Sequence, residues 1–200
     1  YNGDFMASVL KVDSIEPANN VTGLKGMPIE VLSSVCDGST VNVLSGSYTF
    51  QNVTTQQVTT RTYTDITGSV ISYLPPSGTS RVIYTFHCND GQGSASGGHV
   101  LLHHKFFIDS VEVEKARKTT GGYNYHYGQE IIHSWTINCA ADSNDATKGQ
   151  FTSWTSLKEL KWQVRDYSSG YIGNIHGTTY WDGTTGDHFS MPRLTITAIR

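Results

Sequence analysis

The chain has 200 residues, a formal net charge of −3, and only 16% charged residues. Its Lys and Arg residues form no basic stripe of the kind that binds nucleic acid, and no apolar run approaches the roughly 18 residues of a membrane span. The length suits one large domain with a sizeable core. We therefore expect neither a nucleic-acid-binding protein nor one inserted into a membrane.

The first 28 residues differ from the rest of the chain. They contain one short apolar run, MASVL, which is followed by turn-forming residues such as PANN. Turn formers without a periodic apolar pattern are typical of loops and linkers. We expect residues 1–28 to form a short extended N-terminal arm and residues 29–200 to form a single domain.

Strand patterns begin after Pro28. Four β-branched and aromatic segments are expected to be strands, at residues 29–35, 41–50, 53–66 and 69–74. The sequence PPSG then marks a turn. Beyond it, Val82, Tyr84 and Phe86 alternate with more polar residues, and the same period of two continues in the segments 100–108, 111–114, 159–165 and 194–198. This period is typical of half-buried antiparallel strands.

Long loops rich in Gly, Asn, Asp and Ser separate these strands, and no segment has a convincing helical period. Many short strands with long crossing loops are typical of Greek-key sandwiches and jelly rolls. The predicted fold is an all-β, antiparallel, jelly-roll-like β-sandwich that carries the N-terminal arm.

The sequence offers little chemistry. The three cysteines are far apart and form no CxxC pair, so we expect no structural zinc site and interpret them as buried apolar residues. His99 and His103 would lie about 13 Å apart on one strand, too far to share a metal ion. There is no GxSxG nucleophile motif. We therefore expect no catalytic residue, metal or cofactor, although two acidic residues distant in sequence can still meet in space.

The most distinctive loop covers residues 167–189 and mixes aromatic side chains with Gly, Asn, Asp and His. Aromatic faces combined with short polar groups suit a sugar, which offers both C–H faces and hydroxyls. The contact residues that we predict here are Tyr171, His176, Tyr180, Trp181 and Asp182. The alternative is an ordinary loop packed on its own aromatic residues, with Trp181 as the anchor.

Several segments resemble a module found in structural proteins of tailed phages, particularly marine ones. TYTDI at residues 62–66 is similar to the module's T-x-[FY]-x-D-[IL] strand, and PPSGTSRV at 75–82 to its P-S-S-x-S-[KR]-[IV] turn. LKWQV at 160–164 and LTITAI at 194–199 resemble its late strands. MASVLKVDSI at 6–15 resembles the start of many such proteins. The double proline, the Gly- and His-rich stretch 88–104 and the missing terminal Glu depart from the pattern.

The resemblance implies a non-enzymatic component of a virion, assembled in the host cytoplasm. It implies a tail fibre, head fibre or appendage that forms a homotrimer and can contact the host surface. The arm, through Leu10, Val12 and Ile15, is expected to bind other virion proteins. Two alternatives remain open: a soluble lectin-like sandwich, which would bind a glycan, and a glycan-cleaving enzyme, which would depend on one acidic pair.

Overall fold

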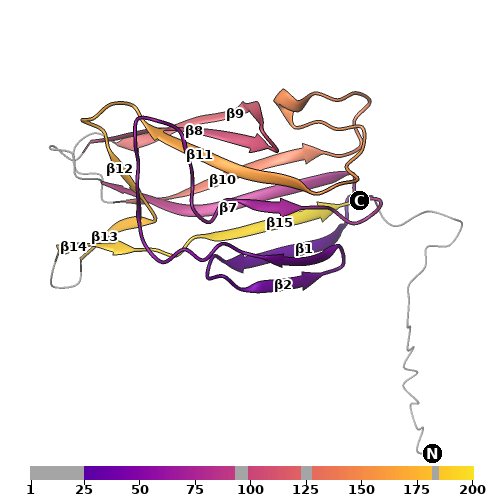
Figure 1. Ribbon diagram of the computed structural model, residues 1–200, viewed down its shortest axis with the longest axis horizontal. Helices are drawn as coiled ribbons and strands as arrows, with labels where there is room; N and C mark the ends of the chain where they lie inside the picture. Colours follow the sequence, from indigo (N-terminus) through magenta and orange to yellow (C-terminus); the bar gives the residue numbers. More distant parts are fainter. Residues whose placement is uncertain (1–24, 93–98, 123–127, 182–184) are drawn as a thin grey trace, which may run out of the picture.

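The computed structural model describes residues 25–92, 99–122, 128–181 and 185–200, and two antiparallel sheets make up most of it (Figure 1). Sheet 1 contains β1 (Pro28–Val35), β15 (Arg193–Ile199), β7 (Arg81–Gln92), β10 (Gln129–Asn138), β12 (Gly173–Ile175) and β4 (Gln57–Val58). Sheet 2 contains β5 (Thr64–Asp65), β6 (Ile71–Tyr73), β11 (Lys158–Asp166), β8 (Val100–Ile108) and β9 (Val111–Gly122).

Two hairpins form separate two-stranded sheets. They are β2 (Thr40–Val43) with β3 (Gly46–Thr49), and β13 (Gly177–Trp181) with β14 (Thr185–Phe189). The described residues contain no α-helix, only a short 3-10 turn at Ala146–Lys148, and none of their helices could cross a membrane. The predicted class, an all-β antiparallel sandwich with next to no helix, is confirmed.

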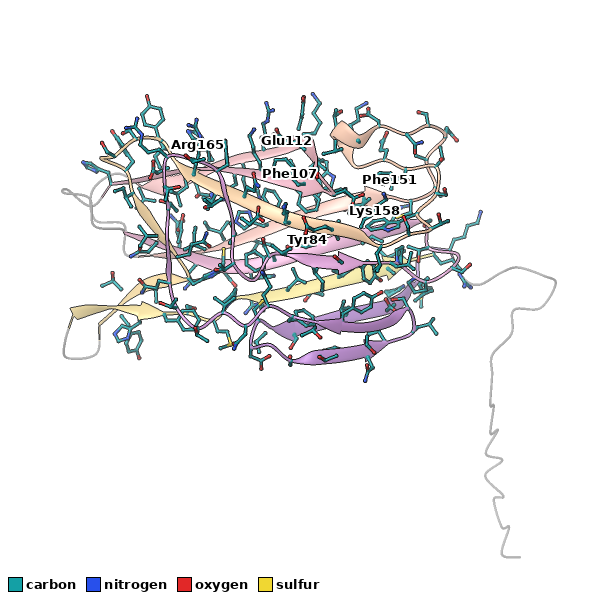
Figure 2. All side chains as sticks on the ribbon, in the orientation of Figure 1. Tyr84, Phe107, Glu112, Phe151, Lys158 and Arg165 are labelled. Carbon is teal, nitrogen blue, oxygen red and sulfur yellow. The ribbon has the colours of Figure 1, made fainter. Side chains whose placement is uncertain are left out.

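The core lies between the two sheets. Alternate residues of β7, β8 and β11 are buried, as their period of two predicts. Tyr84 of β7 meets Phe106 of β8 with their ring centroids 5.2 Å apart, and Phe106 lies equally close to Trp162 of β11. Tyr84 is labelled between the sheets in Figure 2. Each such aromatic side chain stabilises the fold by about 1.5–3 kcal/mol through burial.

Two predicted strands are corrected. Residues 41–50 are not one strand, because a turn at Leu44 and Ser45 divides them into β2 and β3. The segment 53–66 is mostly loop and contains only the two-residue strands β4 and β5. Its residues do not pair along their length because the side chain of Gln57 folds the loop back on itself: its amide nitrogen donates to the Asp65 carbonyl and its oxygen accepts from the Thr67 amide.

The N-terminal boundary lies close to the predicted one. Strand β1 begins at Pro28, and two backbone bonds extend its pairing with the C-terminus, from the Gly26 amide to the Arg200 carbonyl and from the Arg200 amide to the Met27 carbonyl. The predicted arm contacts Leu10, Val12 and Ile15 lie outside the described residues.

All three cysteines are buried and form no disulfide, which agrees with their interpretation as apolar residues. Burial raises the pKa of the Cys36 thiol to about 12, with a smaller contribution from Asp37, and burial raises the pKa of Cys139 to about 12 as well. A protonated, buried thiol is a poor nucleophile.

Candidate functional site

Four aromatic rings form a row at one end of sheet 2. The ring centroids of His99 and Tyr171 lie 5.8 Å apart. Tyr167 stands nearly perpendicular to Tyr171 at 5.7 Å, and His103 continues the row at 6.1 Å from Tyr167. Tyr167 is 55% exposed, so the row is open to solvent. We call these four residues the tyrosine–histidine row.

The backbone fixes this row. The amide of Tyr167 donates to the Leu101 carbonyl at 2.9 Å, and the Leu101 amide donates to the Tyr171 carbonyl, which attaches the loop after β11 to the start of strand β8. Within β8 the odd-numbered residues face outward, because the even-numbered ones fill the core. His103 therefore points to the same side as the two tyrosines.

A groove of about 300 Å³ begins at His103. Its lining residues are Tyr63, His103, His104, Arg117, Lys118 and Thr119. A large bulge in β9 shapes it: the two steps from His104 to Phe106 on β8 face five steps, from Lys118 to Val113, on β9. Bulges of this kind redirect side chains at binding sites. Here the bulge ends at Arg117, so it sets the direction of a cation beside the groove.

Cations surround Tyr63 at the rim of this groove. The ammonium nitrogen of Lys105 lies 4.6 Å from the Tyr63 ring centroid, and the guanidinium carbon of Arg165 lies 5.2 Å from it. Glu112 forms ion pairs with both Arg117 and Lys105. The hydrogen bond from Arg117, and then that from Lys105, lowers the pKa of Glu112. Figure 2 labels Arg165 and Glu112 on this side of the molecule.

The outer face of sheet 1 is a second candidate surface. It carries many hydroxyl and aliphatic side chains. We call it the hydroxyl face, and it consists of Val31, Ser33, Val35, Ile83, Thr85, Ile132, Ser134, Thr136, Thr195 and Thr197.

One row of the hydroxyl face crosses four strands. Ser33 pairs with Thr195, Thr195 with Thr85, and Thr85 with Ser134. The hydroxyls of Ser33 and Thr195 are 2.8 Å apart, and those of Thr85 and Ser134 are 3.2 Å apart. These bonds join hydroxyls of neighbouring strands, and the centre of the face carries no charge.

Charged groups stand at the margins of the hydroxyl face. Glu130 accepts a bond of 2.7 Å from Arg193 and lies 3.0 Å from His87 at one margin. Arg81 occupies the other, where β7 begins. Exposed valine and isoleucine side chains lie between them, with Val31 53% exposed and Ile132 51% exposed.

A polar cluster also lies inside the sandwich. The rings of His104 and His133 are 4.7 Å apart, and His133 lies 4.6 Å from Trp162. The Nζ of Lys118 is 4.9 Å from the Trp162 ring and donates to the Ile132 carbonyl, so it joins the edge strands β9 and β10 of the two sheets. Both ring nitrogens of His133 are buried without a hydrogen-bond partner among the described residues.

Burial decides the protonation of this inner cluster. It lowers the pKa of His104 to about 3, with smaller contributions from Lys118 and His103, and lowers that of His133 well below its ordinary value. Both histidines are therefore neutral near pH 7. A side chain that solvent does not reach is poorly placed for chemistry on a large substrate, so we assign His104 and His133 to the core, whereas Lys118 is partly exposed and also lines the groove.

The structure separates the predicted contact residues. Tyr171 lies in the tyrosine–histidine row, whereas Tyr180, 57% exposed, lies on the β13–β14 hairpin with its ring against His188. Trp181 ends β13, but its side chain is outside the described part of the chain, as is Asp182.

The prediction that His176 lies on a contact surface conflicts with its burial. Its side chain is 0% exposed, and Nε2 donates to the Thr67 carbonyl at 2.9 Å. Burial also lowers the pKa of His176 to about 4. The backbone has a φ of 65° at this position, where β12 turns into β13, and this turn directs the ring inward.

Sequence reasoning missed most of the row. The sequence analysis rejects His99 and His103 as a metal site and assigns them no contact role, and Tyr167 lies in the aromatic loop 167–189 but is not among the predicted contact residues. The signal that could have found them is the outward position of His103 in the alternating strand 100–108. The described residues contain no group of three or more His, Cys, Asp or Glu that could hold a metal ion.

Comparison with known proteins adds no relative: no family model matches the chain, and no curated protein matches it.

Proposed function

We propose that this chain is a non-enzymatic structural protein of a phage virion, a jelly-roll-like tail-fibre, head-fibre or appendage module that associates with copies of itself, for which the resemblance favours a trimer. The sequence resemblance supplies the phage context. The hydroxyl face carries the assembly role, because it presents a broad neutral surface with exposed aliphatic side chains.

The physics of association favours such a face. Burying exposed Val31 and Ile132 against another copy stabilises the contact by about 25 cal/mol per Å² of apolar surface. A neutral centre can meet an identical chain without like-charge repulsion, and symmetric oligomers are the commonest soluble assemblies. The arm, with Leu10, Val12 and Ile15, is proposed to bind other virion proteins.

A soluble glycan-binding protein is the second candidate. The tyrosine–histidine row favours it, since four adjacent rings lie beside a groove with hydroxyl and cationic side chains. The two candidates are compatible, because the row belongs to sheet 2 and the hydroxyl face to the outer side of sheet 1. The non-enzymatic assignment is supported by the inward position of the histidines whose pKa values burial lowers most, which are His104, His133 and His176.

The assembly role is tested by the change Ile132→Lys, which places a charge in the hydroxyl face. We expect the wild-type chain to sediment as an oligomer and the variant to dissociate to monomer, because an unpaired charge at an interface is costly to bury. Sedimentation velocity at several concentrations measures this, and circular dichroism checks that the variant stays folded.

Leu44→Lys is the matched control. Leu44 is 79% exposed in the β2–β3 turn, away from the hydroxyl face, so the same change in charge should leave the oligomer intact. A wild-type chain that is monomeric at tens of micromolar, or an oligomer that both variants leave unchanged, contradicts the proposed assembly through this face.

A further inference from the structure

We infer that the tyrosine–histidine row and the adjoining groove form a binding site for an acidic saccharide, a sugar that carries a carboxylate or a sulfate group. This inference rests on the host-contact part of the proposed function and is independent of self-association. The row would take the sugar ring, and the groove would take its anionic group.

The row has the chemistry of a sugar platform. Tyr167 is exposed and Tyr171 partly exposed, and their rings stand nearly perpendicular, so a saccharide can lie along the first ring and against the second. The imidazoles of His99 and His103 extend the platform at both ends and add polar nitrogens that can bond hydroxyls. His103 Nδ1 lies 3.1 Å from the Thr119 hydroxyl, which fixes the ring at the junction with the groove.

Charge around the groove favours an anion. None of the described residues that line it carries a carboxylate. Four cations stand in or beside it, and they are Lys105, Arg117, Lys118 and Arg165. The nearest carboxylate in their ion-pair network is Glu112, which binds two of these cations and leaves the set with an excess of positive charge. Two further carboxylates act on these cations, the exposed Glu114 on Arg117 and the buried Asp166 on Arg165, so four cations face three carboxylates. Asp65 is bonded to Lys161 and Gln163.

Arg117 is the best-placed residue for the anionic group. It is the last residue of the β9 bulge, its side chain is 54% exposed, and its bond to Glu112 fixes its direction. A guanidinium fixed in this way can bind a carboxylate or sulfate through two parallel N–H donors. The chain as a whole is negative, with a net charge of −3, so a general attraction for polyanions would not account for such binding.

The test measures binding of the full chain to three immobilised polysaccharides by biolayer interferometry: polygalacturonate, dextran sulfate and neutral dextran. We expect binding to at least one acidic polymer and none to neutral dextran. Polygalacturonate alone identifies a uronate-type ligand, and dextran sulfate alone identifies a sulfate ester. Binding to none of the three, or equal binding to neutral dextran, overturns the inference.

Two matched pairs of variants locate the site. Arg117→Gln should weaken binding about tenfold, because a hydrogen bond to a charged group is lost, whereas Arg193→Gln removes the same charge from the opposite sheet and should not. Tyr167→Ala should weaken binding about fivefold through the lost ring contact, whereas Tyr180→Ala, with a similarly exposed tyrosine, should not.

Equal losses in both members of a pair would show attraction to the whole surface and would overturn the inference. Sedimentation of the same samples separates this result from the assembly proposal. If the chain forms oligomers but binds no acidic polymer, the saccharide site alone is contradicted. If it stays monomeric but binds, the assembly role alone is contradicted.

Discussion

Replacing Trp162 with alanine is expected to lower the free energy of unfolding by about 3–5 kcal/mol. Trp162 is fully buried in β11 and lies where the two sheets meet. Its ring contacts Phe106 of the same sheet and His133 of the other. Removing it leaves a cavity that these rings cannot fill, and small domains have only about 5–15 kcal/mol of stability in total.

The backbone of residue 162 makes further bonds, which alanine would keep, so the cost comes from the side chain. Its carbonyl accepts from the Ile66 amide, and its amide donates to the Ser69 hydroxyl at 3.1 Å, so the residue joins β11 to the loop before β6. The Lys118 ammonium, which bridges the two edge strands, would also lose the ring that it faces. Closure of the sandwich at the β9–β10 side therefore depends on this side chain.

Urea unfolding followed by circular dichroism measures the effect. Trp162→Phe is the graded variant: it keeps an aromatic ring and removes a buried indole N–H without a partner, so its loss should be smaller, about 1–2 kcal/mol. Tyr180→Ala, on the exposed hairpin, should change stability by less than about 0.5 kcal/mol. Equal stability of the Trp162→Ala variant and the wild-type chain would contradict the central role of this residue.

The sequence predicts the sheets better than it predicts the surfaces. Alternation in residues 82–86 and 160–164 was sufficient to identify β7 and β11, because a half-buried strand imposes a period of two on its own residues. The segment 53–66 has equally strong strand composition but is mostly loop, and the Gln57 side chain folds it back through bonds to Asp65 and Thr67, 8 and 10 residues further along the chain.

The candidate sites depend on contacts that no local pattern records. His103 and Tyr167 are 64 residues apart, and they meet because β8 and β11 are neighbours in sheet 2 and the loop after β11 folds back over β8. The bulge that directs Arg117 likewise follows from the register between β8 and β9. Conversely, His176 lies in a segment with the composition of an exposed loop, but its side chain is buried, and its Nε2 donates to the Thr67 carbonyl.

Acid is expected to destabilise the fold between pH 6.5 and pH 5 through its buried histidines. The ordinary pKa of histidine is 6.5, and in the folded chain burial lowers the pKa of His104 to about 3, that of His176 to about 4, and that of His133 well below 6.5. At a pH between the folded and unfolded pKa values, the unfolded chain binds protons that the folded chain does not bind. Stability is therefore complete above pH 6.5 and is lost as the pH falls, by up to about 1.4 kcal/mol per pH unit for each histidine.

The pH range distinguishes the effect of the histidines on stability from that of the carboxylates. The pKa values of Asp37 and Asp145 are lowered from 3.8, and that of Glu112 from 4.5, so the stability that these acids contribute is lost mainly below pH 5. A decrease in the free energy of unfolding between pH 7 and pH 5 would thus report the histidines. Urea titrations at several pH values in this range measure it.

His133→Leu tests the origin of the decrease. Leucine has nearly the volume of histidine, and it replaces two buried ring nitrogens that lack partners, so stability at pH 7 should be kept or raised. At pH 5 the variant should exceed the wild-type chain by about 1–2 kcal/mol, because one of the titrating groups is gone. His188→Gln, on the surface of the β13–β14 hairpin, should leave the pH dependence unchanged.

The two sheets meet at His104 and His133, so acid is expected to weaken one particular part of the fold. Protonation of His104 or His133 would place a second cation near Lys118, whose ammonium joins β9 to β10 and already has its pKa lowered by burial. The repulsion acts across the seam between the sheets, so we expect amide hydrogen exchange at pH 5 to increase first in β9 and β10. Exchange that increases first in β1 and β15, or a His133→Leu variant with the pH slope of the wild-type chain, would show that acid acts elsewhere.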